Sequence, residues 1–298
     1  MFQDSRARTE SDAAIATYLA RYPQGSRKTK AVALRRFADW HDGAILDATR
    51  AEIEMFSHHL QDTVGLKRST VYSYLATLSG FYKLAVGDGR IAQDPTVMVR
   101  RPRVQYDDDR LTRLSTHDVE RMLLTAQGRS PQHTAIVALL GLLALRASEA
   151  ASVRIENMNG HEKGHRVLRL IGKGGKPATI PLPPLVARIL DRATAGRTDG
   201  PLLLSRTGRQ LDRNDIYKRV AIIGRDAGLG HVHPHQLRHA GVTAALDAGV
   251  PARDVQAFGR WSDGRMVERY DRNRQSLDRH ASYALAGHLS AVADRIAV

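Results

Sequence analysis

The chain has 298 residues, which is room for about two domains of ordinary size, each with its own hydrophobic core. Lys and Arg together number 45 and Asp and Glu 31, so the formal net charge is +14, and basic residues are in excess on both sides of Val104. This charge favours a polyanionic partner, and the lack of cysteine excludes disulfides, thiolate zinc sites and cysteine nucleophiles.

The first hundred residues predict a compact domain of about four helices. Apolar residues recur at helical spacing near the N-terminus, and again from Ile53 onward, after a capping box formed by Thr49 and Glu52. A longer apolar stripe begins at Val71 and stops at Gly87, because glycine commonly ends a helix.

A polar segment separates this region from the rest of the chain. Residues Arg100 to Arg110 contain a proline and clustered charges but almost no apolar periodicity, which is typical of an interdomain linker. We therefore expect a helical domain over residues 1–104 and a second domain over residues 105–298.

The second domain is predicted to be mainly α-helical with a small β-sheet. Ser115 and Asp118 open a helix, and Ala135 to Leu145 is apolar all round, as a buried helix should be. A β-hairpin is expected where Val167 to Ile171 and Ala178 to Leu182 flank a glycine-rich turn. Further helices are predicted from Leu185, Ile216 and His235.

No segment predicts membrane association. The longest apolar run, Ala135 to Leu145, has about half the length that a membrane span requires. The first ten residues lack the apolar core of a signal peptide, so a cytoplasmic protein is expected.

Arg146 follows the apolar run of the second domain directly. A charge so close to a core must find an anion, because an unpaired buried charge is costly. Glu149, three residues on, is one candidate partner, and a phosphate of a substrate is the other.

Lys173 lies in the predicted hairpin turn, Ile171-Gly-Lys-Gly-Gly-Lys-Pro177. The turn is not a P-loop, because it lacks the glycine spacing and the Ser or Thr after the lysine. It is either a solvated basic turn or a tip from which the lysine reaches a groove and donates a proton.

A histidine-rich segment precedes the helix expected from His235. Pro234 suits a helix start, so His235 and Arg238 lie on one face of the first turn, where N–H groups favour an anion. The rival interpretation is zinc, since His235 and His239 are four residues apart. No HExxH glutamate or cysteine ligand accompanies that pair.

Two aromatic residues near the C-terminus, Trp261 and Tyr270, are nine residues apart. Such residues usually pack in cores, but the segment Arg269 to Arg274 is too polar for a core. Tyr270 is therefore expected to be accessible.

Taken in order, Arg, Lys, His-x-x-Arg, His or Trp, and Tyr, these residues resemble the tyrosine recombinase (phage integrase) family over nearly the whole chain. The resemblance implies a helical core-binding domain and a mixed α/β catalytic domain. It also implies that the catalytic residues are Arg146, Lys173, His235, Arg238, Trp261 and Tyr270, with Glu149 and His239 in supporting positions.

The sequence departs from the family pattern at two places. Ala144 stands where the family commonly has glycine before Leu-Arg. The usual Leu-Gly-His is replaced by Phe258-Gly259-Arg260-Trp261, which is one residue longer. Arg260 thus competes for the His/Trp position, and the nine-residue interval to Tyr270 favours Trp261.

The chemistry of a phosphodiester explains these residue types. Two guanidinium groups, on Arg146 and Arg238, can bind the non-bridging oxygens and stay charged at any working pH, so no metal or other cofactor is expected. Attack by Tyr270 leaves a 3′-phosphotyrosine, which conserves the bond energy without ATP. The resemblance assigns the roles of general base, general acid and phosphate donor to His235, Lys173 and Trp261.

The resemblance further implies that the partner is double-stranded DNA with inverted-repeat core sites, bound in the nucleoid. It also implies a protein that is a monomer in solution and a homotetramer on two sites. An apolar stripe at Leu285, Leu289, Val292 and Ile296 packs either on its own subunit or on the next protomer. Further candidate DNA-binding residues are Lys67, Arg68, Arg100, Arg101 and Arg103.

Several functions stay open at this point. The first is an integrase of a phage or mobile element, and the second is a Xer-type chromosome or plasmid resolvase. A type IB topoisomerase and a DNA-binding regulator with a dead active site are the others.

Overall fold

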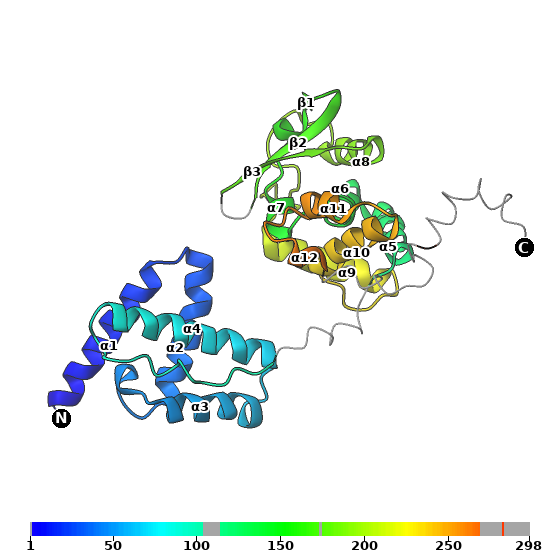
Figure 1. Ribbon diagram of the computed structural model, residues 1–298. Helices are drawn as coiled ribbons and strands as arrows, with labels where there is room; N and C mark the ends of the chain where they lie inside the picture. Colours follow the sequence, from blue (N-terminus) through cyan, green and yellow to red (C-terminus); the bar gives the residue numbers. More distant parts are fainter. Residues whose placement is uncertain (1, 104–113, 173–174, 269–281, 283–298) are drawn as a thin grey trace, which may run out of the picture. The chain divides into compact units, whose positions relative to one another are not determined.

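A computed structural model of the chain describes residues 2–103, 114–172, 175–268 and 282 (Figure 1). The chain divides into two compact units, residues 1–108 and 109–298. The predicted boundary at residue 104 and most of the predicted linker fall within 104–113, outside the described residues. The prediction of a mainly helical protein with one small sheet is confirmed.

The N-terminal unit is helical. Its elements are α1 (Phe2–Ala20), α2 (Gln24–Trp40), the 3-10 helix η1 (Ile45–Asp47), α3 (Arg50–His58), the π-helix η2 (His59–Thr63) and α4 (Arg68–Gly87).

Two sequence signals of this unit act as predicted. The Thr49 side chain accepts a hydrogen bond from the Glu52 backbone at 3.3 Å, and Glu52 Oε2 accepts from the Thr49 backbone at 2.7 Å. The apolar stripe of α4 is buried, and it packs with Phe37 and Phe56 in one core.

The second unit is built from short helices and a three-stranded sheet (Figure 1). Its elements are α5 (Thr116–Arg129), α6 (Pro131–Val137), the π-helix η4 (Ala138–Leu142), α7 (Ala147–Ala151), the 3-10 helix η5 (Ile155–Met158), β1 (Gly160–Glu162), β2 (His165–Ile171), β3 (Pro177–Pro181), α8 (Pro184–Thr194), α9 (Arg213–Asp226), α10 (Pro234–Asp247), α11 (Ala252–Gly259) and α12 (Arg265–Glu268).

The prediction of one continuous helix from Ala135 to Leu145 is wrong. The α-helical part ends at Val137, a π-helical turn follows to Leu142, and Ala144 has a φ of 48°. Burial is correctly predicted, because almost every residue of this segment is buried. The segment is enclosed by packing on all sides, so its hydrophobicity carries no information about where the helix stops.

The sheet is antiparallel, in the order β1-β2-β3, and its β2–β3 hairpin is the predicted one. Leu168 pairs with Ile180, and both side chains face the core. Strand β1 was not predicted, because its three residues, Gly-His-Glu, carry no apolar alternation.

Helix α10 packs against η4 at a point where two glycines meet. A side chain at Gly241 would overlap the carbonyl group of Gly141, and a side chain at Gly141 would press on Val119. Glycine is needed here because the two backbones approach closely. This contact brings the segment that ends at Arg146 next to the helix that carries Arg238.

None of the helices in the described part of the chain is both long and apolar enough to span a lipid bilayer.

Candidate active site

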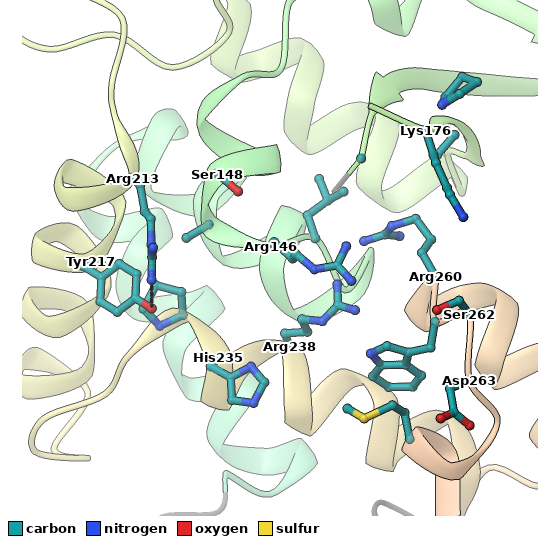
Figure 2. Close-up of a pocket in the computed structure, with 18 residues that line it drawn as sticks. Arg146, Ser148, Lys176, Arg213, Tyr217, His235, Arg238, Arg260, Ser262 and Asp263 are labelled. Carbon is teal, nitrogen blue, oxygen red and sulfur yellow. Dashed lines mark hydrogen bonds between the residues drawn. The ribbon is translucent and has the colours of Figure 1, made fainter. Parts of the chain in front are cut away.

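A pocket of about 1030 Å³ opens in the second unit between the β2–β3 hairpin, the start of α10 and the end of α11 (Figure 2). Among the described residues that line it, one is acidic, Asp263, and the basic ones are Arg146, Lys176, Arg213, His235, Arg238 and Arg260. An excess of positive charge in a concave site favours an anionic ligand.

Four of the predicted catalytic residues meet in this pocket. Arg146, His235, Arg238 and Trp261 all line it, although they come from three separate segments of the chain. Figure 2 shows the guanidinium groups of Arg146 and Arg238 pointing toward one another, with His235 beside Arg238. The other two predicted catalytic residues, Lys173 and Tyr270, lie outside the described residues.

Arg146 is held by the partner that the sequence suggested. It caps α7, its Nη1 donates to Glu149 Oε1 at 2.6 Å, and its backbone N–H donates to Glu149 Oε2 at 2.8 Å. The Arg146 side chain is still 29% exposed and lines the pocket. The two partners proposed from the sequence are therefore compatible, because Glu149 binds one side of the guanidinium group and leaves another side free for a phosphate.

Glu149 is itself buried, with its side chain 3% exposed. Burial alone raises the pKa of this carboxyl, but hydrogen bonds from Arg146 and the charges of Arg260 and Arg146 outweigh it and lower the pKa below the ordinary value. Glu149 is therefore a carboxylate at neutral pH and orients Arg146.

Arg238 is buried, and its side chain is fixed by backbone carbonyls. Its Nη1 donates to the carbonyl of Ala144 and its Nη2 to the carbonyl of Gly259. The guanidinium carbon lies 5.4 Å from the centroid of the Trp261 ring, a cation–π contact. These bonds connect α10 to the segment before Arg146 and to the end of α11.

Helix α10 begins at Pro234, as predicted, and its first turn is capped by a hydrogen bond of 2.8 Å from the His233 backbone to the Gln236 side chain. His235 is exposed on this turn and lines the pocket. Its neighbour His239 does not line the pocket, and its Nδ1 is 3.3 Å from the hydroxyl of Thr243. Within the described ranges, no three His, Asp or Glu side chains are grouped as metal ligands.

Arg260 and Trp261, the two candidates for the His/Trp position, both line the pocket. Their side chains have different environments, since Arg260 donates to Glu149 and to backbone carbonyls whereas Trp261 stacks against Arg238. The one-residue extension of the Phe258-Gly259-Arg260-Trp261 segment is the signal that pointed to both residues.

Other pocket residues were not assigned a role from the sequence. Lys176 immediately precedes β3, and Arg213 lies at the start of α9, where its guanidinium carbon is 5.3 Å from the ring centroid of Tyr217. Lys176 belongs to the same basic turn as Lys173. Arg213 has no local signal, because only the folded chain brings α9 to this pocket.

The five candidate DNA-binding residues outside the catalytic motifs lie in the N-terminal unit and are exposed. Lys67 and Arg68 stand at the start of α4. The Arg101 guanidinium carbon lies 5.7 Å from the centroid of the exposed Tyr72 ring. The other two are Arg100 and Arg103.

We expect Gly259→Ala to displace Trp261. A Cβ at Gly259 would overlap the six-membered part of the indole, so the ring must leave its place against Arg238. Tryptophan fluorescence and near-ultraviolet circular dichroism of the folded variant should both change. Gly264→Ala is the matched control, because among the described residues its Cβ meets Gln256 alone, at an ordinary 3.4 Å. Unchanged spectra for Gly259→Ala would contradict the packing described.

Known proteins match most of the chain. The phage integrase family matches residues 112–276, more than half of the chain, and the N-terminal SAM-like domain of phage integrases matches residues 12–89. Tyrosine recombinase XerD of Pseudomonas aeruginosa is 30% identical over 244 residues, which are 77% of this chain and 80% of that protein. Tyrosine recombinase XerC of Roseiflexus sp. is 27% identical over 236 residues, 76% and 73% of the two chains.

Solved structures share the fold. A lambda integrase dimer bound to a COC′ core site has a TM-score of 0.70 at 15% identity, covering 86% of this chain and 96% of that one. The Tn1549 transposon integrase in complex with circular intermediate DNA has a TM-score of 0.68 at 19% identity, covering 86% and 94%. The chain therefore belongs to the phage integrase family and is a site-specific tyrosine recombinase, an enzyme that breaks and rejoins DNA.

Proposed function

We propose that the chain cleaves DNA by attack of the Tyr270 hydroxyl on a phosphodiester held in the pocket. The observation that carries this proposal is the convergence of Arg146, His235, Arg238 and Trp261 on one positively charged pocket. Negative charge that develops on the non-bridging oxygens is stabilised by the two guanidinium groups, which are already oriented by Glu149 and by backbone carbonyls.

Each proton and bond of the cleavage step has a place in this scheme. The Tyr270 oxygen bonds to phosphorus while the bond from phosphorus to the 5′ oxygen breaks. His235 accepts the tyrosine proton, Lys173 donates a proton to the leaving 5′ oxygen, and the Trp261 N–H donates to the phosphate. The product is a 3′-phosphotyrosine, which a 5′ hydroxyl of another strand can attack in the reverse reaction.

We propose that residues 1–104 form the core-binding domain and residues 105–298 the catalytic domain. The two family matches support this division, since the N-terminal match ends at residue 89 and the catalytic match begins at residue 112. The exposed residues Lys67, Arg68, Arg100, Arg101 and Arg103 are proposed to bind the DNA backbone.

Two biological roles suit this chemistry. Integration and excision of a phage or mobile element is the first, and the integrases with which the chain shares its fold support it. Resolution of chromosome or plasmid multimers is the second, and the XerD and XerC proteins at 30% and 27% identity support it. Both roles place the protein on DNA in the cytoplasm.

For either role we propose a homotetramer on two inverted-repeat DNA sites, assembled from monomers. A lambda integrase of the same fold has been seen as a tetramer bound to a Holliday junction. The apolar stripe from Leu285 to Ile296, proposed to join neighbouring protomers, lies outside the described residues.

Strand exchange between two differently labelled duplexes tests the proposed function. Recombinant strands and a protein–DNA adduct that resists detergent are expected, and mass spectrometry of the adduct should place the nucleotide on Tyr270. A type IB topoisomerase would relax supercoiled DNA and join no strands between duplexes, and an inactive regulator would bind DNA and form no adduct. Either result would refute the proposal.

A further inference from the structure

Arg260 has an unusual place beside the active site. It follows α11 in a left-handed conformation, with φ 51° and ψ 49°, and its side chain is 15% exposed. An arginine buried to this extent must be paired, because the free energy of desolvating its charge is large.

Both η nitrogens of the Arg260 guanidinium group donate to protein oxygens. Nη2 donates to the Ala144 carbonyl at 2.6 Å and to Glu149 Oε2 at 3.1 Å. Nη1 donates to the carbonyls of Phe258 at 3.1 Å and Leu143 at 3.3 Å. The four hydrogens on the two η nitrogens are thus committed to protein oxygens, which leaves them unavailable to a phosphate.

These acceptors also bind Arg146 and Arg238, the two arginines proposed to hold the phosphate, which together we call the clamp. Glu149 Oε2 also accepts from the backbone of Arg146, and its other oxygen binds the Arg146 side chain. The Ala144 carbonyl also accepts from Arg238. Arg260 therefore shares the acceptor Glu149 with Arg146 and the Ala144 carbonyl with Arg238. It also immediately precedes Trp261, which stacks on Arg238.

From this arrangement we infer that Arg260 is a positioning residue, which holds Glu149 and the Leu143–Ala144 carbonyls so that Arg146 and Arg238 present their guanidinium groups to the scissile phosphate. The inference rests on the proposed function. It assigns to Arg260 a role different from that of Trp261, because Arg260 acts through Glu149 and does not contact the substrate.

The electrostatics of Glu149 provide a signature of this role. Two charged groups form ion pairs with Glu149: Arg146, at the start of its own helix, and Arg260, at the end of α11. The β2–β3 hairpin approaches it at the uncharged Gly172. Removing the Arg260 charge should raise the pKa of Glu149, since that charge helps to lower it.

Protonation of Glu149 should stop cleavage, because Glu149 orients Arg146 only as a carboxylate. Protonation of His235, the proposed general base, also slows cleavage on the acid side, so the acid limb of the profile reports both groups. In Arg260→Met the pKa of Glu149 is higher than in the wild type, so its protonation adds to that of His235, and the acid limb should become steeper and move to higher pH.

The experiment compares the full-length wild type with Arg260→Met, Arg260→Lys, Glu149→Gln and the double variant Glu149→Gln/Arg260→Met, using single-turnover cleavage of site DNA over a range of pH. Arg260→Met should bind DNA like the wild type but cleave it on the order of 10²-fold more slowly, the effect of a misplacement of about 1 Å.

Arg260→Lys keeps the charge and should return the acid limb to its normal place. The double variant should be no slower than the slower single variant, because both changes break the same contact.

Arg253→Met is the matched control, because Arg253 is an exposed arginine on the same helix. Its pH profile should be that of the wild type. The inference is overturned if Arg260→Met cleaves at the wild-type rate, if its acid limb does not move, or if the effects of Arg260→Met and Glu149→Gln multiply.

If Arg260→Met does not fold, Arg260→Gln and Arg260→Lys compared over the same pH range replace it, and equal profiles for these two overturn the inference. A wild type that forms no adduct refutes the proposed function itself, whereas a wild-type adduct with an unaffected Arg260→Met refutes only the role of Arg260.

Discussion

Tyr270→Phe should abolish the covalent protein–DNA adduct and leave the affinity for site DNA unchanged. The change removes one oxygen atom and keeps the aromatic ring, so the loss of the adduct would identify that oxygen as the nucleophile. Tyr270 follows Trp261 by nine residues, and Trp261 lines the pocket. The expected loss is complete, because no other group in the scheme can form the phosphotyrosine bond.

The measurement for Tyr270 is gel analysis of labelled DNA after denaturation in detergent, with a binding assay on the same preparation. Tyr283→Phe is the control, because Tyr283 is the next tyrosine along the chain. It should form the adduct at the wild-type level. An adduct that persists in Tyr270→Phe and disappears in Tyr283→Phe would move the nucleophile to Tyr283.

The second large effect is expected from Arg146→Lys and Arg238→Lys. Both keep the positive charge but lose the planar guanidinium group with its paired N–H donors. Single-turnover cleavage should therefore slow by at least ~10²-fold, as when one preorganised transition-state donor is lost. Arg238→Lys should be the more damaging. One ammonium group at the end of a shorter chain cannot reproduce the bonds of Arg238 to the Ala144 and Gly259 carbonyls together with a bidentate contact to phosphate.

Arg188→Lys is the control for these two variants, because Arg188 is an exposed arginine of α8 and does not line the pocket. It should cleave like the wild type. DNA affinity of the clamp variants should fall much less than their cleavage rate, since the clamp acts mainly on charge that develops in the transition state. Cleavage near the wild-type rate in both clamp variants would refute the assignment of the clamp.

Several features of this protein follow from its sequence alone. The capping boxes at Thr49 and Ser115 and the apolar stripe of α4 predict their helices correctly, because such signals act within a few residues of chain. The β2–β3 hairpin is likewise local. The candidate site residues were named from the resemblance of five short motifs, taken in order, to the tyrosine recombinase family, and four of these residues line the pocket.

Long-range contacts decide the remaining features. The apolar run after Ala135 changes to a π-turn and then to a left-handed Ala144, and the π-turn contains Gly141, where α10 approaches closely at Gly241. The sequence places Glu149 near Arg146, but only the folded chain adds Arg260 from more than a hundred residues away. The tertiary structure decides which carbonyls and rings lie within reach of each side chain. Arg260 is oriented toward Glu149, and Trp261 toward Arg238, because a buried guanidinium group must bond the acceptors that surround it.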